Sequence, residues 1–352
     1  GGSGRERHDR GRSRGITAVV IISRAPVRFS LGGGGTDLPS YYRQYGGYVV
    51  TAAIDRYVYV LANRRFYDDI RLAYSETEIV PDVRSIRHRI FRAALEMVGI
   101  ERAIELASVA DVPANSGLGS SGTFTVALLN ALHAYKREFV STTQLAEEAC
   151  ELEMIRLGDP VGKQDQYIAA FGNVTALTID PSGEVHAEPV PIRDEVMGEL
   201  ENNLVALYSG IERPASAVLS EQGSRVRAHD PATIAGMHRI KEIGHEVYRL
   251  LVSGELDLYG ELLHDHWTRK RSLTSRMTDA VIDEDYAAAR AAGALGGKLM
   301  GAGGGGFFLF YVRPADRRRL IETMEARGLR TLRFRFDLDG ARIVANLHRA
   351  TR

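Results

Sequence analysis

The segment PANSGLGSSG, residues 113–122, lies between a sequence typical of a strand and one typical of a buried helix. It contains Gly117, Gly119 and Gly122 in the order G-x-G-x-x-G, the spacing of a dinucleotide-binding loop. Such a loop requires a second strand that ends at an acidic residue about 20 positions later. Residues 136–150, KREFVSTTQLAEEAC, are instead typical of a turn and a further helix. The dinucleotide-binding interpretation therefore fails.

Two other kinds of nucleotide loop are excluded by their spacing. The pairs Gly162-Lys163 and Gly297-Lys298 both lack the upstream glycine and the following serine or threonine of a Walker A loop. The HRD and DFG motifs of protein kinases do not occur in the sequence.

The loop nevertheless has the chemistry of a phosphate-binding site. Gly117 and Gly119 allow the backbone to approach a phosphate without interference from a Cβ atom. The helix expected to begin near Ser120 directs free N–H groups and the positive end of its dipole at the same point. Ser116, Ser120 and Ser121 add hydroxyl groups that can bind phosphate oxygen or Mg²⁺. Taken alone, the segment is also compatible with a tight strand-to-helix turn.

Two further glycine-rich segments favour ligand binding. Residues 26–39, PVRFSLGGGGTDLP, place Arg28 and Asp37 around a loop that follows an expected strand. Residues 297–307, GKLMGAGGGGF, form a third loop. Structural turns rarely need four consecutive glycines, so these loops indicate several places where the backbone approaches a ligand closely.

Composition restricts the class of protein. The 352 residues include 45 basic and 45 acidic side chains, which gives no reason to expect nucleic acid as a partner. No run approaches about 18 consecutive apolar residues, so we expect no membrane span. The single cysteine, Cys150, cannot form an intramolecular disulfide, which favours a reducing compartment, and we expect a cytoplasmic protein. Residues 1–16 are expected to be a tag or a disordered arm because they are polar and glycine-rich.

The hydrophobic pattern predicts an α+β protein of two domains, because strands and helices follow one another without regular alternation. The expected strands are residues 17–23, 25–31, 48–54, 57–62, 103–109, 173–179, 184–190, 202–210, 307–312 and 331–336. The expected helices are residues 83–98, 123–135, 142–156, 231–252, 255–275, 279–292 and 315–327.

The three glycine-rich segments resemble the three motifs of the GHMP kinases (galactokinase, homoserine, mevalonate and phosphomevalonate kinases), in the same order and at fitting separations. PANSGLGSSG is similar to the family's ATP loop, P-x-x-x-G-L-G-S-S. The resemblance covers about residues 17–345 and implies an N-terminal ATP-binding α+β domain over 17–197 and a C-terminal ferredoxin-like domain over 198–352, with the active site between them. It also implies the use of ATP and Mg²⁺. The expected ATP-binding residues are Ser116, Gly117, Leu118, Gly119, Ser120, Ser121 and Gly122.

The resemblance extends to the residues of phosphoryl transfer. Galactokinase-like members of the family have a glutamate and a catalytic aspartate in the order E-x₁₁-D-Q, which resembles Glu153 and Asp165 in EMIRLGDPVGKQDQ. Asp165 is therefore our candidate general base, Arg28 its expected partner, and Glu153 and Ser121 the expected Mg²⁺ ligands. Simpler alternatives are a helix N-cap for Asp165, a solvated helix face for Glu153 and a surface cation for Arg28.

The acceptor loop departs from the galactokinase pattern. RFSLGGGGTD is similar to the galactokinase sugar loop R-x-N-L-I-G-E-H-T-D, but it has Gly34 and Gly35 where galactokinases have glutamate and histidine. We expect Thr36 and Asp37 to complete the acceptor site, with Asp37 accepting hydrogen bonds from sugar hydroxyls, although a turn-forming aspartate is the plain alternative. From the third loop we expect Gly303 and Gly304 to line the same site.

The segments GGGGTDLP, GKQDQYIAAFG and YSGIERPAS resemble the GHMP kinases that act on a heptose 7-phosphate. The resemblance implies transfer of the γ-phosphoryl group to the anomeric hydroxyl of D-glycero-D-manno-heptose 7-phosphate. A second phosphate on the acceptor needs cations, and the candidates are Arg213, Lys298 and Lys163. The alternatives are a C1 kinase of a free sugar such as fucose, or a non-catalytic ligand sensor on the same fold. The expected partner is a small sugar, and the protein is expected to be a monomer or a homodimer.

Overall fold

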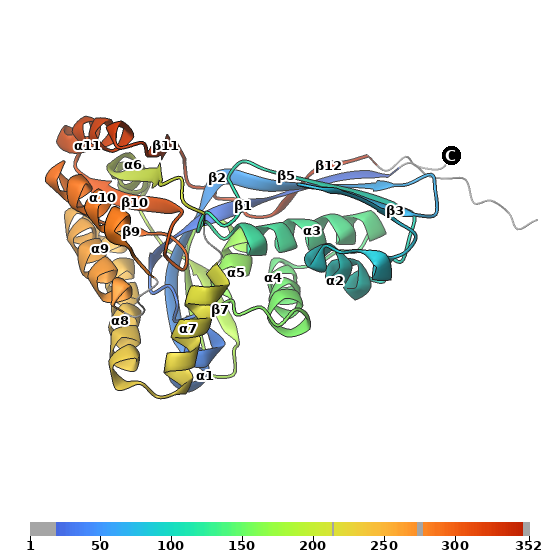
Figure 1. Cartoon of the computed structure of the whole chain (residues 1–352), viewed down its shortest axis with the longest axis horizontal. Helices are drawn as coiled ribbons and strands as arrows, with labels where there is room; N and C mark the ends of the chain where they lie inside the picture. The colour runs from blue at the N-terminus through green and yellow to red at the C-terminus, as the bar shows by residue number, and fades with distance from the viewer. Residues whose placement is uncertain (1–18, 213–214, 273–276, 348–352) are drawn as a thin grey trace, which may run out of the picture.

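The computed structural model describes residues 19–212, 215–272 and 277–347 and contains two β-sheets covered by helices (Figure 1). The larger sheet has the strand order β12-β1-β2-β5-β3-β4, and β6 and β7 extend it from β2. Its strands are β1 (Val20–Gly32), β2 (Gly47–Arg64), β3 (Ile70–Ala73), β4 (Thr77–Val80), β5 (Ile104–Ala110), β6 (Val174–Ile179), β7 (Val185–Pro189) and β12 (Arg342–Asn346).

Two long strands run through the middle of this sheet and position the acceptor loop. β1 and β2 pair in antiparallel fashion along almost their whole length, with register shifts at Pro26/Arg28 and Ser30/Gly32. Past the second shift the chain leaves the sheet through the glycine-rich segment 33–36. β2 is long enough to pair with β6 over its first half and with β5 over its second half. Arg28 lies on β1 opposite Ala53 of β2, and its backbone N–H donates to the carbonyl oxygen of Leu118 at 3.0 Å, which connects it to the ATP loop.

Helices cover one face of the larger sheet (Figure 1). They are α2 (Arg89–Val98), α3 (Ser120–Lys136), α4 (Thr142–Cys150) and α5 (Gln164–Phe171). α3 packs directly on β1 and β2, and its residues from Val126 to Leu129 are fully buried. This burial agrees with its sequence, which is apolar on nearly all sides. The ATP loop thus leads into α3, the central helix of the domain.

The smaller sheet belongs to the C-terminal half and has the antiparallel order β11-β8-β10-β9. Its strands are β8 (Leu204–Tyr208), β9 (Ala294–Leu299), β10 (Phe307–Val312) and β11 (Arg330–Leu332). The accompanying helices are α6 (Asp194–Asn203), α7 (Ala215–Arg227), α8 (Pro231–Ser253), α9 (Leu256–Arg271), α10 (Ala280–Ala291) and α11 (Pro314–Ala326). A four-stranded antiparallel sheet with helices agrees with the expected α+β, ferredoxin-like C-terminal domain.

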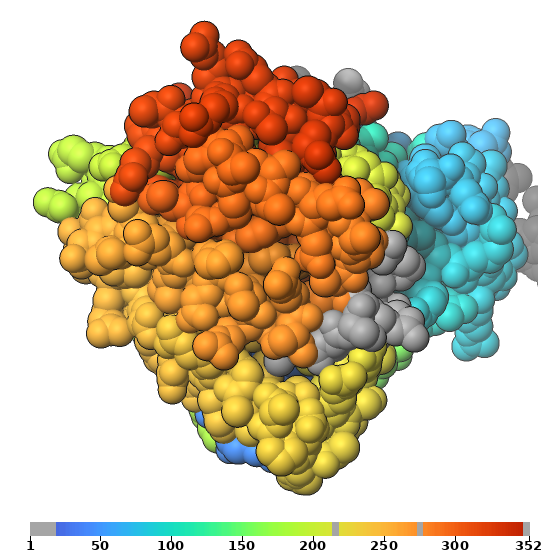
Figure 2. Space-filling view, turned by 60° about the vertical axis from the view of Figure 1, so that its left-hand side comes forward, coloured from blue at the N-terminus to red at the C-terminus, as the bar shows by residue number. Residues whose placement is uncertain are grey.

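The two halves are joined by packing as well as by the chain. α8 packs against β1 and β2 of the larger sheet, while α9 packs against β9 of the smaller one. Figure 2 shows the C-terminal helices as one continuous surface, with the end of the larger sheet around β3 and α2 projecting beyond it. After β11 the chain returns to the larger sheet, where β12 pairs with β1. The last strand therefore belongs to the larger sheet, although the strand before it, β11, belongs to the smaller one.

The elements differ from the expected pattern in a few places. Residues 17–23 and 25–31 were expected as two strands and form the single strand β1, because Arg24 continues the ladder with β2. The helix expected over 83–98 begins only at Arg89, after a short 3₁₀ turn, η1 (Val83–Ser85). Apart from β12, the elements not expected from sequence are α1 (Pro39–Tyr45), β3, β4, α6, α7 and β9, whose second half was expected to belong to the third glycine loop. None of the described helices is long and apolar enough to cross a membrane.

Candidate active site

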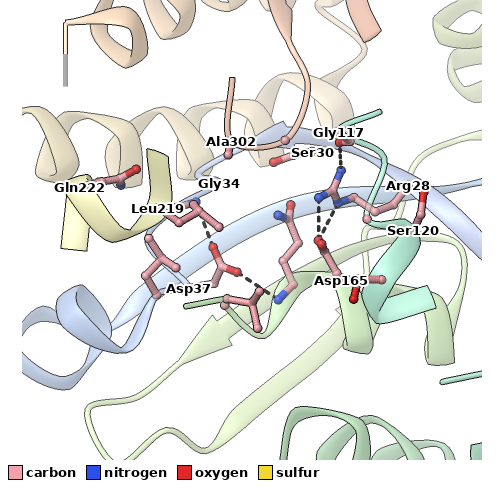
Figure 3. A pocket seen from close by; sticks show the side chains of 18 of the residues that line it. Arg28, Ser30, Gly34, Asp37, Gly117, Ser120, Asp165, Leu219, Gln222 and Ala302 are labelled. Carbon is pink, nitrogen blue, oxygen red and sulfur yellow. Dashed lines mark hydrogen bonds and ion pairs between the residues drawn. The ribbon is translucent and has the colours of Figure 1, made fainter. Parts of the chain in front are cut away.

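The three glycine loops meet around one pocket between the two halves of the protein (Figure 3). β1 and the acceptor loop contribute its base, the ATP loop one wall, the start of α5 a second wall, and α7, α9 and the third loop the cover. The lining residues include Arg28, Ser30, Gly34, Gly35, Asp37, Asn115, Ser116, Gly117, Gly119, Ser120, Ser121, Gly162, Gln164, Asp165, Leu219, Gln222, Lys270, Gly301 and Ala302. The pocket thus brings together most of the residues expected to act.

Arg28 and Asp165 form the central ion pair of the pocket. The guanidinium contacts the carboxylate oxygen Oδ1 through Nε at 2.8 Å and through Nη2 at 2.7 Å. Its Nη1 also donates to the carbonyl oxygen of Gly117 at 2.6 Å. Arg28 is buried, whereas Asp165 retains 30% side-chain exposure, on the side that faces the pocket (Figure 3). The arginine therefore holds the carboxylate in place and leaves its other oxygen, Oδ2, available to a ligand.

The backbone of the ATP loop explains why glycine is needed next to this pair. Gly119 precedes α3 with φ +78°, a conformation that favours glycine. A Cβ atom at this position would lie 3.0 Å from Cγ of Asp165 and 3.3 Å from Nε of Arg28. Residue 119 thus allows the start of α3 to contact the ion pair directly.

Unpartnered hydroxyl groups identify the part of the loop suited to phosphate. The Oγ atoms of Ser116 and Ser120 are buried and have no hydrogen-bond partner among the described residues. Both residues line the pocket, and Ser120 is the first residue of α3, where backbone N–H groups are free. Buried hydroxyls without partners are rare because they lose their hydration. A phosphate group at this point would supply the acceptors that they lack, so the loop fits the triphosphate of ATP.

Glu153 and Ser121 lie together as expected for a metal site. The Ser121 hydroxyl donates to Oε1 of Glu153 at 2.6 Å, and Nε2 of Gln166 donates to Oε2 at 2.6 Å. Glu153 lies on a π-helical turn, η2 (Glu151–Arg156), which continues α4 and is a feature frequent at functional sites. Burial, with repulsion from Asp165 and Asp159, raises the pKa of Glu153 to about 7.

These two oxygen donors suit Mg²⁺ better than any metal that needs a full protein cage. A divalent cation would compensate the buried carboxylate and reverse the upward displacement of its pKa. Among the described residues no group of three or more His, Cys, Asp or Glu side chains is arranged to hold a metal. Mg²⁺ is typically held by one or two protein groups with waters and substrate phosphates. The residues therefore fit the expected ion.

The acceptor loop presents Asp37 to the pocket on the side away from the ion pair (Figure 3). Its carboxylate accepts hydrogen bonds from the backbone N–H groups of Gly35 at 2.9 Å and Gln164 at 3.1 Å. Burial, with repulsion from Asp165, raises the pKa of Asp37. Thr36 has a structural role instead, since its hydroxyl donates to the carbonyl oxygens of Gly33 and Tyr48. Of the expected acceptor-loop residues, Thr36 therefore does not line the pocket, whereas Gly34, Gly35 and Asp37 do.

The third loop contributes different residues from those expected. Gly301 and Ala302 line the pocket, whereas Gly303 and Gly304 do not and pack against Met277. The loop is held against the ATP loop, because the N–H group of Phe307 donates to the carbonyl oxygen of Ser116 at 3.1 Å. The prediction of Gly303 and Gly304 was therefore displaced by two residues from the observed lining.

Neither of the two expected phosphate cations that the structure describes, Lys163 and Lys298, lines the pocket. Lys163 is held away from it by Oε1 of Glu147 at 2.9 Å and the carbonyl oxygen of Gly183 at 2.7 Å. Lys298 is fully buried and does not line the pocket. Arg213 lies outside the described residues. Spacing alone could not distinguish a lysine that faces a ligand from one that closes a structural ion pair.

The sequence interpretation missed several polar residues of the pocket. Lys270 lies on α9 and Gln222 on α7, and Gln164 directly precedes Asp165 in the sequence. Ser30 Oγ and Gln164 Oε1 are buried without a partner among the described residues, which makes both atoms available to a ligand. The unpaired state of these atoms depends on tertiary packing, so no sequence motif could have identified them.

Comparison with known proteins agrees with the site's architecture. Residues 85–173 match the GHMP kinases N terminal domain and residues 247–329 match the GHMP kinases C terminal domain. A D-glycero-alpha-D-manno-heptose 7-phosphate kinase of Campylobacter jejuni is 27% identical over 92% of this chain and 98% of its own length. A bifunctional fucokinase/GDP-fucose pyrophosphorylase of Arabidopsis thaliana is 25% identical, and this chain spans 31% of its length.

Solved structures show the same fold. A D-glycero-D-manno-heptose 1-phosphate kinase from Bacteroides thetaiotaomicron superposes with a TM-score of 0.76 at 24% identity, covering 92% of this chain and 99% of that one. Galactokinase of Lactococcus lactis, solved with galactose, gives a TM-score of 0.71 at 21% identity, covering 92% and 95%. The expected α+β fold with N- and C-terminal domains of this family is therefore confirmed.

Proposed function

The chain belongs to the GHMP kinases and is a phosphotransferase, and we propose that it transfers the γ-phosphoryl group of ATP to the anomeric hydroxyl of D-glycero-D-manno-heptose 7-phosphate. The observation that supports this most is the Arg28–Asp165 pair at the junction of the ATP loop and the acceptor loop. A carboxylate at this junction can contact the acceptor hydroxyl and lie close to the phosphate that it attacks.

Asp165 acts as the general base in this proposal. Its pocket-facing oxygen accepts the proton of the acceptor hydroxyl as that oxygen attacks phosphorus, which raises the nucleophilicity of the sugar oxygen. Arg28 fixes the carboxylate in one orientation through two N–H groups, so little reorganisation is needed during transfer. The guanidinium also lies where negative charge grows on the transferring phosphoryl group.

The ATP loop and Glu153 hold the donor in the same proposal. Backbone N–H groups at the start of α3 and the hydroxyls of Ser116 and Ser120 bind phosphate oxygens. Glu153 and Ser121 hold Mg²⁺, which when bound neutralises charge on the β- and γ-phosphates. The protein thereby orients the donor for in-line transfer to the acceptor hydroxyl that Asp165 deprotonates.

Two features support a heptose 7-phosphate rather than galactose as acceptor. The relative from Campylobacter jejuni that bears this name is similar over nearly the whole length of both chains. In addition, a side chain at position 34 would collide with Ser30, since a Cβ atom there would lie 2.4 Å from its Oγ. A glutamate at this point, as in galactokinases, would require the Ser30 hydroxyl to move.

The test is ADP release from Mg²⁺-ATP with a panel of acceptors. The panel contains D-glycero-D-manno-heptose 7-phosphate, the unphosphorylated heptose, mannose, fucose, galactose and mevalonate. We expect turnover with the heptose 7-phosphate at a kcat/KM at least about 100-fold above that of any free sugar, because charged recognition contributes strongly to specificity. Phosphorus NMR of the product then identifies the hydroxyl that received the phosphate.

Equal or better turnover with a free sugar such as fucose would replace this acceptor with the free-sugar alternative, which the similarity to the fucokinase also favours. Binding of ATP and sugar without any ADP release would instead identify a ligand sensor. The retention of Asp165, Glu153 and Ser121 in contact geometry favours an enzyme, because a sensor has no need of them.

A further inference from the structure

A cluster of basic side chains lies between the pocket and the core of the C-terminal half. It consists of Lys270 and His266 on α9 and Lys298 on β9. All three are buried, with exposed fractions of 7% for Lys270 and 0% for the other two. Electrostatic repulsion acts between Lys270 and Lys298 and between each of them and His266. Burying three basic groups together is unfavourable unless an anion compensates them.

Lys270 is the member of this cluster that lines the pocket. Its Nζ donates one hydrogen bond, to the carbonyl oxygen of Gly301, and no carboxylate within the described residues forms an ion pair with it. An ammonium group has three donors, so two remain for a ligand. Burial, with repulsion from Arg28, lowers the pKa of Lys270 to about 8. The group is therefore a desolvated cation without a directly paired carboxylate among the described residues.

Lys298 and His266 lie deeper than Lys270 and add two more basic groups to the cluster. Nζ of Lys298 and both ring nitrogens of His266 have no hydrogen-bond partner among the described residues. Burial and the neighbouring lysines lower the pKa of His266 well below its usual value. Burial and repulsion from Lys270 and Arg28 likewise lower the pKa of Lys298 well below its usual value. An anion next to Lys270 would favour the charged forms of all three groups and so raise their pKa values.

The position of Lys270 distinguishes between the two phosphates that could approach it. Among carboxylates, it is Asp37 of the acceptor loop that stabilises the charge on Lys270. The transfer centre already has its own groups, since Arg28 pairs with Asp165 and Glu153 binds Ser121. Lys270 therefore lies within electrostatic reach of both Arg28 and Asp37, and because Arg28 is already paired with Asp165, we assign Lys270 to an anion on the acceptor side.

We propose that Lys270, backed by Lys298, is the receptor for the second phosphate of the acceptor. Two N–H donors of Lys270 bind the phosphate oxygens of the sugar phosphate, while its third stays on Gly301 and fixes the side chain. This inference rests on the proposed function, in which the acceptor is a sugar phosphate. It assigns the acceptor phosphate to a residue that the motif comparison did not indicate.

The experiment compares Lys270→Met with the wild-type enzyme on the heptose 7-phosphate and on the unphosphorylated heptose. Methionine retains the buried aliphatic stem and removes the charge. We expect the ratio of the two kcat/KM values to fall about 100-fold, because a buried charged hydrogen bond is lost, while the KM for ATP stays within about threefold. Lys270→Arg should restore part of the ratio, and thermal unfolding of each variant reports whether it is folded.

Matched variants separate this receptor from other cations. Arg271→Met removes an exposed neighbour that pairs with Asp283, and it should leave the ratio unchanged. Arg43→Leu and Arg227→Leu remove the two arginines of an adjoining pocket that shares Leu38 and Leu219. A fall in the ratio of the two kcat/KM values in those variants, together with an unchanged ratio in Lys270→Met, would overturn the proposal. So would an equal loss on both acceptors or a large rise in the KM for ATP.

Inorganic phosphate distinguishes a failure of this inference from a failure of the proposed function. If the wild-type enzyme shows no preference for the phosphorylated acceptor, the proposed acceptor is wrong. The receptor still predicts that inorganic phosphate competes with the acceptor in the wild-type enzyme and that Lys270→Met weakens this competition about tenfold or more. Phosphate inhibition that is absent, or identical in both proteins, contradicts the receptor.

Discussion

At the scale of single residues, the pocket stabilises three carboxylates in three different ways. Asp165 is paired with a guanidinium, Asp37 accepts backbone N–H groups, and Glu153 accepts neutral side-chain donors. Burial raises the pKa of Glu153 to about 7 and outweighs the hydrogen bonds from Ser121 and Gln166, which lower it. Glu153 is therefore the carboxylate whose properties depend most on a bound cation.

Glu153→Gln should remove a pH dependence of stability in the enzyme without nucleotide and metal. Because the folded-state pKa of Glu153 lies above its ordinary value of 4.5, the native state binds more protons than the unfolded state between pH 4.5 and about 7. Its contribution to stability is therefore fully present below pH 4.5 and lost as the pH rises through 7. We expect the variant to match the wild type at pH 5 and to exceed its unfolding free energy by about 2–3 kcal/mol at pH 8.

Denaturant unfolding at several pH values measures this difference. Addition of Mg²⁺-ATP should stabilise the wild type and have much less effect on Glu153→Gln, because the variant lacks the charged ligand. A difference between the two proteins that does not change with pH would show that Glu153 ionises normally.

Individual residues were predictable where a motif fixes both identity and spacing. Asp165, Glu153, Arg28 and Ser121 were all named from sequence, and the structure brings them into contact in pairs. The cations were not predictable, because the environment of a lysine depends on its tertiary partners. Lys163 satisfies Glu147, whereas Lys270, on a helix without any motif, reaches the pocket.

At the scale of elements, the glycine loops exist because backbones and side chains approach one another too closely for a Cβ atom. Gly117 packs on Met300 and Gly301, with its ideal Cβ 2.6 Å from the carbonyl oxygen of Met300. Gly306 faces the carbonyl oxygen of Ser116 in the same way, at 2.2 Å. The ATP loop and the third loop therefore form one packed unit, in which substitutions act on the site through geometry.

Gly119→Ala should impair catalysis much more than stability would explain. The new methyl group would lie 3.0 Å from Cγ of Asp165, so the carboxylate must move by a few tenths of an ångström. We expect kcat to fall about 10- to 100-fold, because small displacements of a catalytic group are costly, and the unfolding free energy to fall by about 1 kcal/mol.

Gly99→Ala is the matched control for the backbone effect. Gly99 also has positive φ, +71°, but a Cβ atom there would meet nothing within 4 Å. It should lose a similar amount of stability, about 1 kcal/mol, and retain wild-type kcat. Equal kcat values for the two variants would mean that residue 119 does not position Asp165.

Elements were predictable where the hydrophobic pattern is strong and local. The helices α3, α8 and α10 were expected within a few residues of their observed bounds. The short strands β3 and β4 were missed, because each has only four residues and is defined by its neighbours in the sheet. α1 and α7 were missed because their sequences mix polar and apolar residues. Both helices cover the acceptor side of the fold.

At the scale of the whole molecule, the pocket depends on contacts between distant parts of the chain. The acceptor loop, the ATP loop and the third loop lie more than 70 residues apart from one another in sequence. The larger sheet is completed only by the last strand, where β12 pairs with β1 upstream of Arg28. The predicted boundary between residues 197 and 198 separates most elements of the two sheets, but β12 crosses back over it.

Truncation after Gly340 should destabilise the N-terminal half although it removes no pocket residue. The deletion removes β12 and leaves the edge of β1 from Ile21 to Arg24 without its ladder. We expect a loss of about 2–4 kcal/mol in unfolding free energy, from several hydrogen bonds and the packing of Ile343. Truncation after Leu347 retains β12 and should lose much less unfolding free energy. Thermal unfolding of both truncated proteins measures the difference. Equal stability of the two truncated proteins would show that β12 is dispensable.

The measurement that tests the central claim most directly is turnover by Asp165→Asn with the acceptor that the wild type uses best, together with calorimetric titration of both proteins with ATP. Asparagine retains the size of the side chain and a contact with Arg28 but cannot accept the proton. We predict a fall in kcat of at least about 10³-fold, with a Kd for ATP within about threefold of the wild type. Near-wild-type turnover by Asp165→Asn would contradict the assignment of this carboxylate as the base on which the proposed transfer depends.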